Sequence, residues 1–192
     1  MLENILERNN ASLKTKITVK TAVSVGLILL AVTLPQIAHL AVGTAAGITL
    51  LPMYLPVIMG GCLLGSKWGL AVGVASPLVS FLITSLFGTP MPAFSRLPFM
   101  MAELAVFAVV SGLFSNKIAQ KPVLSFAAVL LAQLCGRAFF LLLVFAFGSV
   151  TPLTVPAVWG QIKSGFVGLA IQLVIVPIIV MLLSKIFEKE NR

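Results

Sequence analysis

Residues Gly88–Leu104 read GTPMPAFSRLPFMMAEL and join two long apolar segments of the chain. The stretch holds three prolines, one arginine (Arg96) and one glutamate, Glu103, which is the only acidic residue between Glu7 and Glu188. Its glycine and first prolines predict an irregular connection, and LPFMMAEL predicts the start of an apolar helix. An ionised side chain within such a helix costs about 2.5–3.5 kcal/mol on insertion scales, so Glu103 is expected to face a partner or a wet cavity.

The whole chain shares this apolar character. Of its 192 residues, 59% are hydrophobic and 9% are charged, and the mean hydropathy is +1.13. A soluble domain of this size needs more charge to cover its surface, and apolar segments of about 20 residues recur along the chain. We therefore expect an all-α integral membrane protein built as a bundle of six transmembrane helices, over Thr21–Leu34 (with an extension toward Leu40), Thr49–Leu64, Trp68–Phe87, Leu97–Ser115, Val123–Phe147 and Gln161–Phe187.

The distribution of cations predicts the orientation of this bundle. Lysine and arginine are enriched on the cytoplasmic side of membrane proteins. With the N-terminus inside, the inner side holds ten of these residues, whereas the outer side holds Arg96 and Lys163. We therefore expect both termini to be cytoplasmic, with an amphipathic or loosely ordered arm over 1–20, a membrane domain over 21–187 and a short tail over 188–192. The protein is expected in the cell membrane of a prokaryotic-type cell, as a multi-pass protein.

The net charge of +8 does not indicate nucleic acid. The cations cluster at the ends of the predicted spans, where topology and contact with anionic lipid headgroups explain them. No phosphate-binding loop is present, because Gly65-Ser66-Lys67 lacks the glycine-rich run before it. The chain has one histidine and one acidic residue within the membrane region, so the sequence predicts no metal centre, no cofactor, no catalytic pair and no ATP hydrolysis by this chain.

The predicted connections differ between the two sides. The inner ones are short, whereas the outer ones, Pro35–Ile48, Gly88–Arg96 and Gly148–Gly160, are longer and rich in proline and glycine. A bundle of this kind can form a ligand pocket at its outer side, between helices and under the loops.

Four polar side chains lie inside the predicted spans, at Glu103, Gln133, Arg137 and Gln172. Glu103 and Arg137 lie at similar depths below the outer side, so their side chains can meet. Gln133 shares a helix face with Arg137, four residues away. Two interpretations stay open: the pair fixes helix packing only, or it reaches into the outer pocket and binds a polar ligand.

Other candidates are weaker. Arg96 is either a snorkelling anchor or a contact at the pocket rim, and His39 in the first outer loop is either solvated or a ligand contact. Trp159 is either an interfacial residue or pocket lining. Met91 and Phe94 are candidate lid contacts.

Small residues at regular spacing and two cysteines lie within the apolar segments. Gly61, Gly65, Gly69 and Gly73 recur every four residues, which is typical of close helix packing in lipid. Ala22 and Gly26 form a similar pair, which packs inside the bundle or docks onto another membrane protein. The two cysteines, Cys62 and Cys135, are expected to be buried free thiols.

The run PVIMGGCLLGSKWGLAVGVASPLVSFLIT (56–84), the loop GTPMP (88–92) and LPFMMAELAVFAVVSGLF (97–114) carry a family resemblance. In their order and spacing they resemble the substrate-binding S components of energy-coupling factor (ECF) vitamin transporters. The resemblance extends over about residues 18–187, and its densest part is Pro56–Phe114.

The resemblance implies a function and partners. Such a protein captures a vitamin or related micronutrient with high affinity from outside, and associates with a transmembrane coupling protein and two ABC ATPases that hydrolyse ATP. The family's Ala-xxx-Ala contact with the coupling protein would correspond to Ala22 and Gly26, a loose match. The family's ligand site, between the outer halves of spans four to six, brings forward Glu103, Arg137, Gln133, Arg96, Trp159 and Lys163.

The substrate stays open at this stage. Candidates include cobalamin, pantothenate, hydroxymethylpyrimidine or another vitamin precursor, and queuosine-type bases. The alternative function is an autonomous channel or facilitator for a small polar solute, and a membrane enzyme is disfavoured because the sequence shows no nucleophile–base set.

Overall fold

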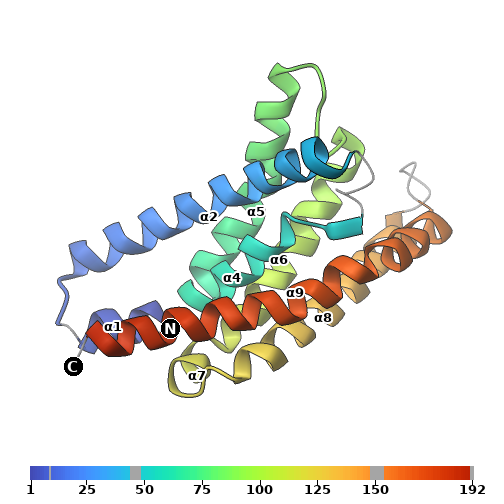
Figure 1. The fold of residues 1–192 in the computed structure, drawn as a ribbon. Helices are drawn as coiled ribbons and strands as arrows, with labels where there is room; N and C mark the ends of the chain where they lie inside the picture. Colours follow the sequence, from blue (N-terminus) through green and yellow to red (C-terminus); the bar gives the residue numbers. More distant parts are fainter. Residues whose placement is uncertain (9, 44–48, 148–153, 191–192) are drawn as a thin grey trace.

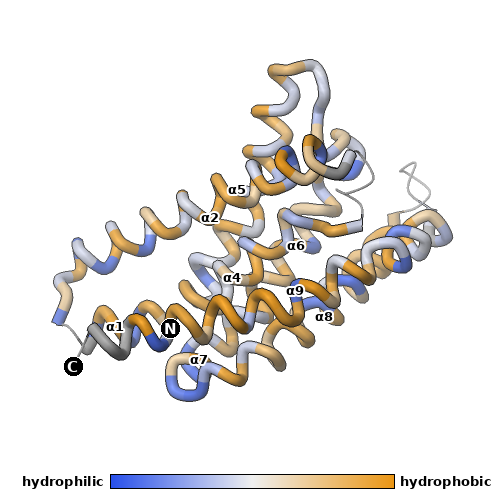
Figure 2. Tube along the Cα trace, viewed as in Figure 1, coloured by the Kyte–Doolittle hydropathy of each residue, from blue (hydrophilic) through white to orange (hydrophobic). Residues whose placement is uncertain are grey.

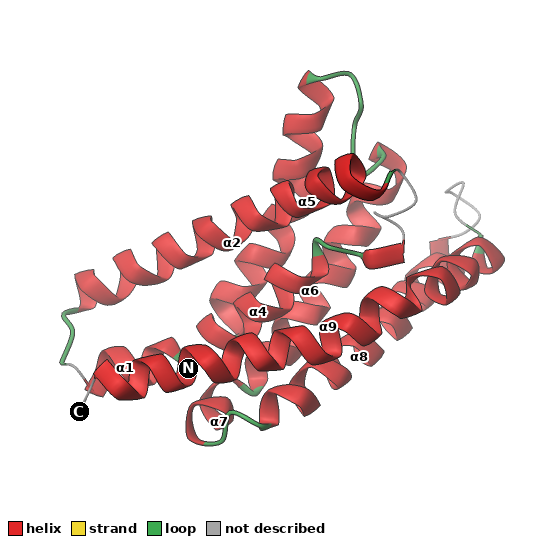
Figure 3. Ribbon diagram, in the orientation of Figure 1, coloured by secondary structure: helices red, strands yellow, loops and turns green. Residues whose placement is uncertain are grey.

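The computed structural model describes residues 1–8, 10–43, 49–147 and 154–190, and within these ranges the chain forms helices and no strand (Figure 3). The all-α prediction is therefore confirmed for this part of the chain. The helices are α1 (Leu2–Arg8), α2 (Leu13–Val42), α4 (Tyr54–Leu64), α5 (Ser66–Leu86), the 3-10 turn η1 (Phe94–Arg96), α6 (Leu97–Leu113), α7 (Ser115–Gln120), α8 (Leu124–Phe147) and α9 (Val155–Glu190).

Five of these helical segments are long and apolar enough to cross a membrane: Leu13–Ala41, Ser66–Leu86, Phe94–Leu113, Leu124–Phe147 and Pro156–Ile186. Apolar residues dominate all of them, and polar residues gather around α1, the start of α2 and α7 (Figure 2). The predicted second span contains α4, an apolar helix of 11 residues. At 1.5 Å per residue α4 is about 17 Å long, shorter than the hydrocarbon core, so α4 alone does not meet the criterion for a span.

The short helix α4 lies in the middle of the bundle (Figure 1). Ten of its 11 residues are buried, and it contacts α2, α5, α6 and α9. Around it, α5 packs on α6, α6 on α8, and α8 on α9. The N-terminus, α7 and the C-terminal end of α9 lie at one end of the bundle, and the connection between α5 and α6 lies at the other (Figure 1).

Two predicted helix starts are wrong, and the first helix ends near the predicted extension toward Leu40 instead of at Leu34. Helix α2 begins at Leu13, where Ser12 caps it by accepting a hydrogen bond from the Thr15 N–H at 3.2 Å. It then continues through Pro35 to Val42, because a membrane helix tolerates the loss of one N–H donor. Helix α9 begins six residues before Gln161. The predicted outer loops at 35–48 and 148–160 therefore shrink, and their cores, 44–48 and 148–153, lie outside the described residues.

Glycines allow α4, α5 and α6 to approach closely. A Cβ built on Gly61 would lie 2.5 Å from the carbonyl oxygen of Ala108, and one on Gly73 would lie 2.6 Å from that of Leu104. One on Gly69 would lie 2.9 Å from the Cα of Gly61. These three glycines confirm the interpretation that small residues allow close helix packing. Gly65 has a different role: it lies between α4 and α5 and adopts a φ of +84°, which favours glycine.

The cysteines and the N-terminal segment differ in part from prediction. Cys62 is buried, but Cys135 is exposed on the surface of the bundle, because its position on α8 faces away from the neighbouring helices. Residues 2–8 form α1, which packs against α2, α4 and α7, so a loosely ordered arm is wrong for this segment.

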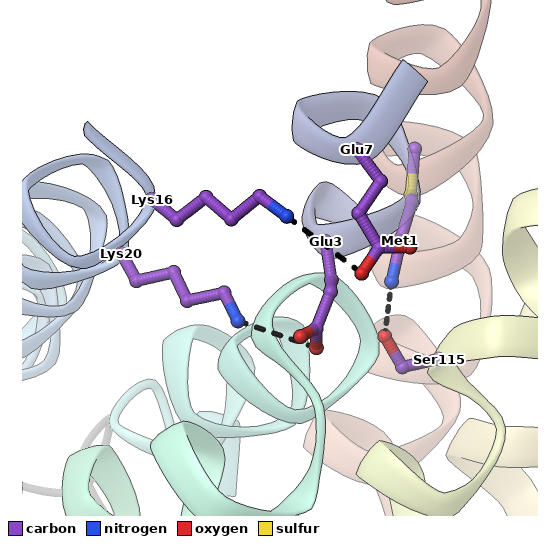
Figure 4. Close-up of polar contacts among 6 residues, drawn as sticks. All are labelled: Met1, Glu3, Glu7, Lys16, Lys20 and Ser115. Carbon is purple, nitrogen blue, oxygen red and sulfur yellow. Dashed lines mark hydrogen bonds and ion pairs between the residues drawn. The ribbon is translucent and has the colours of Figure 1, made fainter. Parts of the chain in front are cut away.

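Polar contacts hold α1 in place (Figure 4). Glu3 pairs with Lys20 at 3.2 Å, Glu7 pairs with Lys16 at 3.8 Å, and the Met1 α-amino group donates a hydrogen bond to the Ser115 hydroxyl. The Met1 side chain is buried in the same core cluster as α4. Burial lowers the pKa of the Met1 α-amino group from 8.0 to about 6.

The close glycine contacts predict that adding a single methyl group at one of these glycines lowers the stability of the protein. Gly73→Ala should lower the stability of the purified protein by about 1–3 kcal/mol, because the new Cβ pushes α5 away from α6. Gly26→Ala is the matched control, since a Cβ at Gly26 meets no atom within 4 Å. Melting temperatures in one detergent measure the effect, and equal values for the two variants would contradict it.

The buried amine predicts that stability rises with pH between about 6 and 8. In this window the amine of the unfolded chain is still protonated while the folded one has lost its proton. The unfolded state therefore binds more protons, and raising the pH favours the folded state. Melting temperatures across this range measure the rise. Protein acetylated at the Met1 amine should show a smaller rise, and identical profiles for the two forms would refute the assignment.

Candidate functional site

A cavity of about 450 Å³ lies at the end of the bundle opposite α7. Successive helices run in alternating directions, so the C-terminal parts of α2, α5 and α8 meet the N-terminal parts of α4, α6 and α9 at this end (Figure 1). All six helices and the segment before α6 contribute to the lining: Pro35, Gln36, His39, Leu51, Pro52, Met53, Tyr54, Ser80, Met91, Pro92, Ala93, Arg96, Met100, Glu103, Arg137, Phe140 and Gln161. The volume falls in the range of about 300–1,000 Å³ that is typical of small-molecule sites.

The lining includes a buried charged pair. Arg137 Nη1 lies 3.0 Å from Glu103 Oε1, and both side chains are more than 90% buried. The predicted approach of α6 and α8 through this pair is therefore confirmed. Tyr54 completes the group, since its hydroxyl donates a hydrogen bond to Glu103 Oε2 at 2.9 Å. Glu103 Oε2 is thus hydrogen-bonded, whereas Oε1 is held by the ion pair and accepts no hydrogen bond from the described residues.

Aromatic contacts fix the positions of these three residues. The Arg137 guanidinium lies 5.1 Å from the centre of the Tyr54 ring, within range of a cation–π interaction. The Tyr54 ring packs on Phe107 at 5.0 Å between centroids. Phe107 fills the space beside Gly136, where a Cβ would lie 2.3 Å from the ring. Since Phe107 is four residues from Glu103 and Gly136 is next to Arg137, this contact sets the spacing of α6 and α8 at the level of the ion pair.

The segment before α4 is held by α9. The Gln172 side-chain amide donates hydrogen bonds to the carbonyl oxygens of Leu50 and Leu51, at 3.1 and 2.9 Å. Leu51 has a φ of +49°. This conformation costs a non-glycine residue about 1–3 kcal/mol, so it persists only where the surrounding contacts enforce it. Gly168 allows the approach, because a Cβ there would lie 2.5 Å from the Leu50 carbonyl oxygen. These contacts place Tyr54 at the cavity.

The Gly88–Arg96 connection is tied back to α5. Ser80 and Thr84 donate hydrogen bonds to the Met91 carbonyl oxygen at 2.9 and 3.2 Å, and the Met91 N–H donates to the Thr84 hydroxyl at 2.8 Å. Met91 and the two residues after it line the cavity. Hydrogen bonds to a membrane helix thus hold this wall of the cavity.

Arg96 belongs to the cavity lining and is exposed. When the Gln161 amide is oriented with its oxygen toward Arg96, that oxygen accepts a hydrogen bond from each terminal guanidinium nitrogen at 3.2 Å. This contact joins the start of α6 to the start of α9. The rim-contact interpretation therefore describes where Arg96 lies better than an isolated anchor does.

The structure brings together some predicted residues and leaves others apart. Glu103, Arg137, Arg96, His39 and Met91 line the cavity. His39 was predicted in a loop, and this is wrong because α2 extends past Pro35 and carries His39 in its last turn.

Four other candidates lie outside the lining. Gln133 donates its amide hydrogen bond to the Leu169 carbonyl oxygen on α9, at 3.1 Å. Lys163 lies over the Trp159 ring at 6.0 Å, and both residues are exposed. Phe94 packs on Phe81 at 5.9 Å and is 75% exposed.

Sequence reasoning missed Tyr54, Gln36 and Gln161. Tyr54 is the chain's only tyrosine and lies between Pro52 and Pro56, which was a usable signal for a special position. Gln36 was assigned to the outer connection after the first span, and Gln161 to the first residue of the last span. The structure places both residues inside longer helices, α2 and α9, and at these positions they line the cavity.

Two further findings concern metal binding and similarity to known proteins. Within the described ranges, no group of three histidine, cysteine or acidic residues is arranged to hold a metal ion. The chain matches no protein-family model, and comparisons with curated proteins and with solved structures found no match. The function must therefore be argued from the geometry of the cavity.

The charged pair predicts a graded loss of stability. Glu103→Gln should destabilise the protein by about 3–5 kcal/mol, because it leaves the buried Arg137 without a counter-charge. Tyr54→Phe should cost less, about 1.5–3 kcal/mol, since it removes one hydrogen bond to a charged group. Melting temperatures in a common detergent give the order.

A double variant serves as the internal control. Combining Glu103→Gln with Arg137→Gln should recover part of the loss, because no isolated charge remains in the bundle. A double variant whose loss equals the sum of the two single losses would show that the groups do not interact.

Proposed function

We propose that this protein is the substrate-binding membrane subunit of an ECF-type importer that takes up a vitamin or related micronutrient. The observation that carries the proposal is the cavity at one end of the bundle, with the buried group of Tyr54, Glu103 and Arg137 in its lining. A buried charged group beside a small-molecule-sized cavity in a membrane helix bundle is typical of a solute-binding site. The resemblance of residues 56–114 to S components supplies the transport class.

The proposal includes a membrane topology. We infer six membrane segments, counting α4 with the residues before it as the second, and both termini on the cytoplasmic side. The start of α2 (Lys14, Lys16, Lys20) and α7 (Lys117) carry lysines at the end opposite the cavity, which fits the positive-inside rule. The cavity then opens toward the outside, where a nutrient is captured.

Partner subunits are part of the same proposal. ATP hydrolysis is assigned to two ABC ATPases joined to a transmembrane coupling protein, and this chain needs no cofactor of its own. The proposed contact with the coupling protein is the surface of α2 at Ala22 and Gly26. Support comes from the open space there: Ala22 is exposed, and a Cβ on Gly26 would lie more than 4 Å from every described atom of the neighbouring helices.

Uptake experiments test the function. Small molecules carried through purification are identified by mass spectrometry, and uptake of the compound found is measured in cells with and without the coupling protein and ATPases. We expect uptake that requires hydrolysis-competent ATPases, and co-purification of all four subunits. Equal uptake without the ATPases would instead establish the alternative, an autonomous channel or facilitator.

The docking surface gives a more specific prediction. Gly26→Leu should leave the melting temperature and ligand binding of the isolated protein unchanged, because a Cβ at this position meets no described atom of a neighbouring helix within 4 Å. It should lower co-purification of the coupling protein and energised uptake by about tenfold or more, since small residues allow close helix contact. Ala170→Leu, on the exposed face of α9, is the control and should leave both unchanged. Normal assembly with Gly26→Leu would refute this contact.

A further inference from the structure

We propose that the cavity takes a small molecule with one carboxylate and a largely apolar body, and that Arg137 holds the carboxylate. This inference rests on the proposed function only in taking the cavity as the substrate site. It narrows the substrate to a chemical class, which the transport assignment leaves open.

The first argument is the hydrogen bonding of Arg137. Its guanidinium has donors on three nitrogens, and Nη1 faces Glu103 at 3.0 Å. The other two nitrogens, Nε and Nη2, are buried and have no hydrogen-bond partner among the described residues. In arginine the Nε–H and one Nη2–H lie parallel along one edge, spaced to match the two oxygens of a carboxylate. The protein therefore leaves unused the edge of Arg137 that suits a bidentate carboxylate.

The second argument is the role of Glu103. Its Oε2 accepts a hydrogen bond from Tyr54, whereas Oε1 lies 3.0 Å from Arg137 Nη1 as an ion pair and accepts no hydrogen bond from the described residues. Glu103 is a positioning residue in this scheme: its ion pair with Nη1 fixes the guanidinium, while Nε and Nη2 are buried beside the cavity without a partner among the described residues.

The third argument is the remaining polar lining. On α2, Gln36 Nε2 is a buried donor without a partner among the described residues, and His39 Nδ1, which donates or accepts according to the tautomer, is also unpartnered there. Both residues line the cavity together with Arg137. Unpartnered buried donors favour a ligand that brings acceptor oxygens, since such groups are normally satisfied.

The fourth argument is charge. The lining has two guanidinium groups, Arg96 and Arg137, and one carboxylate, Glu103, which leaves one positive charge with His39 counted as neutral. A monoanion compensates this charge, whereas a cationic ligand, or a phosphate monoester that is dianionic at neutral pH, leaves an excess. The rest of the lining is mainly methionine, proline, leucine and phenylalanine, which suits an apolar body.

A matched set of probes tests the class. Binding of 4-phenylbutyrate, its isosteric amide 4-phenylbutanamide and 3-phenylpropyl phosphate is measured by calorimetry on purified protein in lipid nanodiscs. We expect the carboxylate to bind at least about tenfold more tightly than the amide and than the phosphate. Similar or tighter binding of either of these two, or no binding of the carboxylate up to about 10 mM, overturns the proposal.

A variant then tests the role of Arg137. Arg137→Lys keeps the charge but lacks the two-donor edge, so the preference for carboxylate over amide should fall by about tenfold. An unchanged preference in the folded variant overturns the role of Arg137. If this variant does not fold, Gln36→Leu replaces it and should weaken carboxylate binding severalfold, and unchanged affinity overturns the assigned donor set. Failure of the carboxylate class leaves ATPase-dependent uptake intact, because that experiment uses whichever compound is carried through purification.

Discussion

The buried contact between Glu103 and Arg137 imposes the strongest constraint on this bundle. Two ions inside an apolar helix bundle offset the cost of leaving water only when they meet in good geometry, and hydrogen bonds to their remaining atoms lower that cost further. Tyr54 supplies one such hydrogen bond, and the packing of Phe107 against Gly136 brings α6 and α8 to the required distance. The two charges therefore dictate which residues can occupy the positions around them, and small residues must stand where the helices cross.

The constraint extends beyond the pair through Tyr54. The tyrosine reaches Glu103 only because the chain before α4 adopts an unusual backbone at Leu51, held by Gln172 of α9. Gly168 clears the space for this approach, and the close glycine contacts of α4, α5 and α6 fix the depth of α4. Helices far apart in the sequence thus cooperate to place one hydroxyl group, and the cavity forms at the same level.

The sequence predicted the features that depend on local composition or on a large energy. Long apolar runs identified α5, α6 and α8 closely, and the cost of a charge in hydrocarbon identified Glu103 and Arg137 as a pair. It could not predict the residues whose roles depend on contacts between distant segments. Tyr54 needs the Gln172 contact, and Gln133 turned out to bond the backbone of α9. His39 and Gln161 were misplaced because helix ends follow caps and packing: Pro35 did not end α2, and α9 began six residues earlier than its apolar run suggested.

The free energy of burying the Glu103–Arg137 pair helps to explain why the cavity lies beside it. Replacing a buried ion pair by apolar residues of similar volume is often neutral or stabilising, so stability alone gives no reason for Glu103 and Arg137 in this bundle. A pair that served only packing would also be expected to use all of its donors, yet two nitrogens of Arg137 have no hydrogen-bond partner in the part of the chain that the structure describes. Both observations favour a site in which the protein holds one side of the guanidinium and leaves the other for a solute. On this view the charged group costs the empty protein stability, and the bound solute offsets that cost.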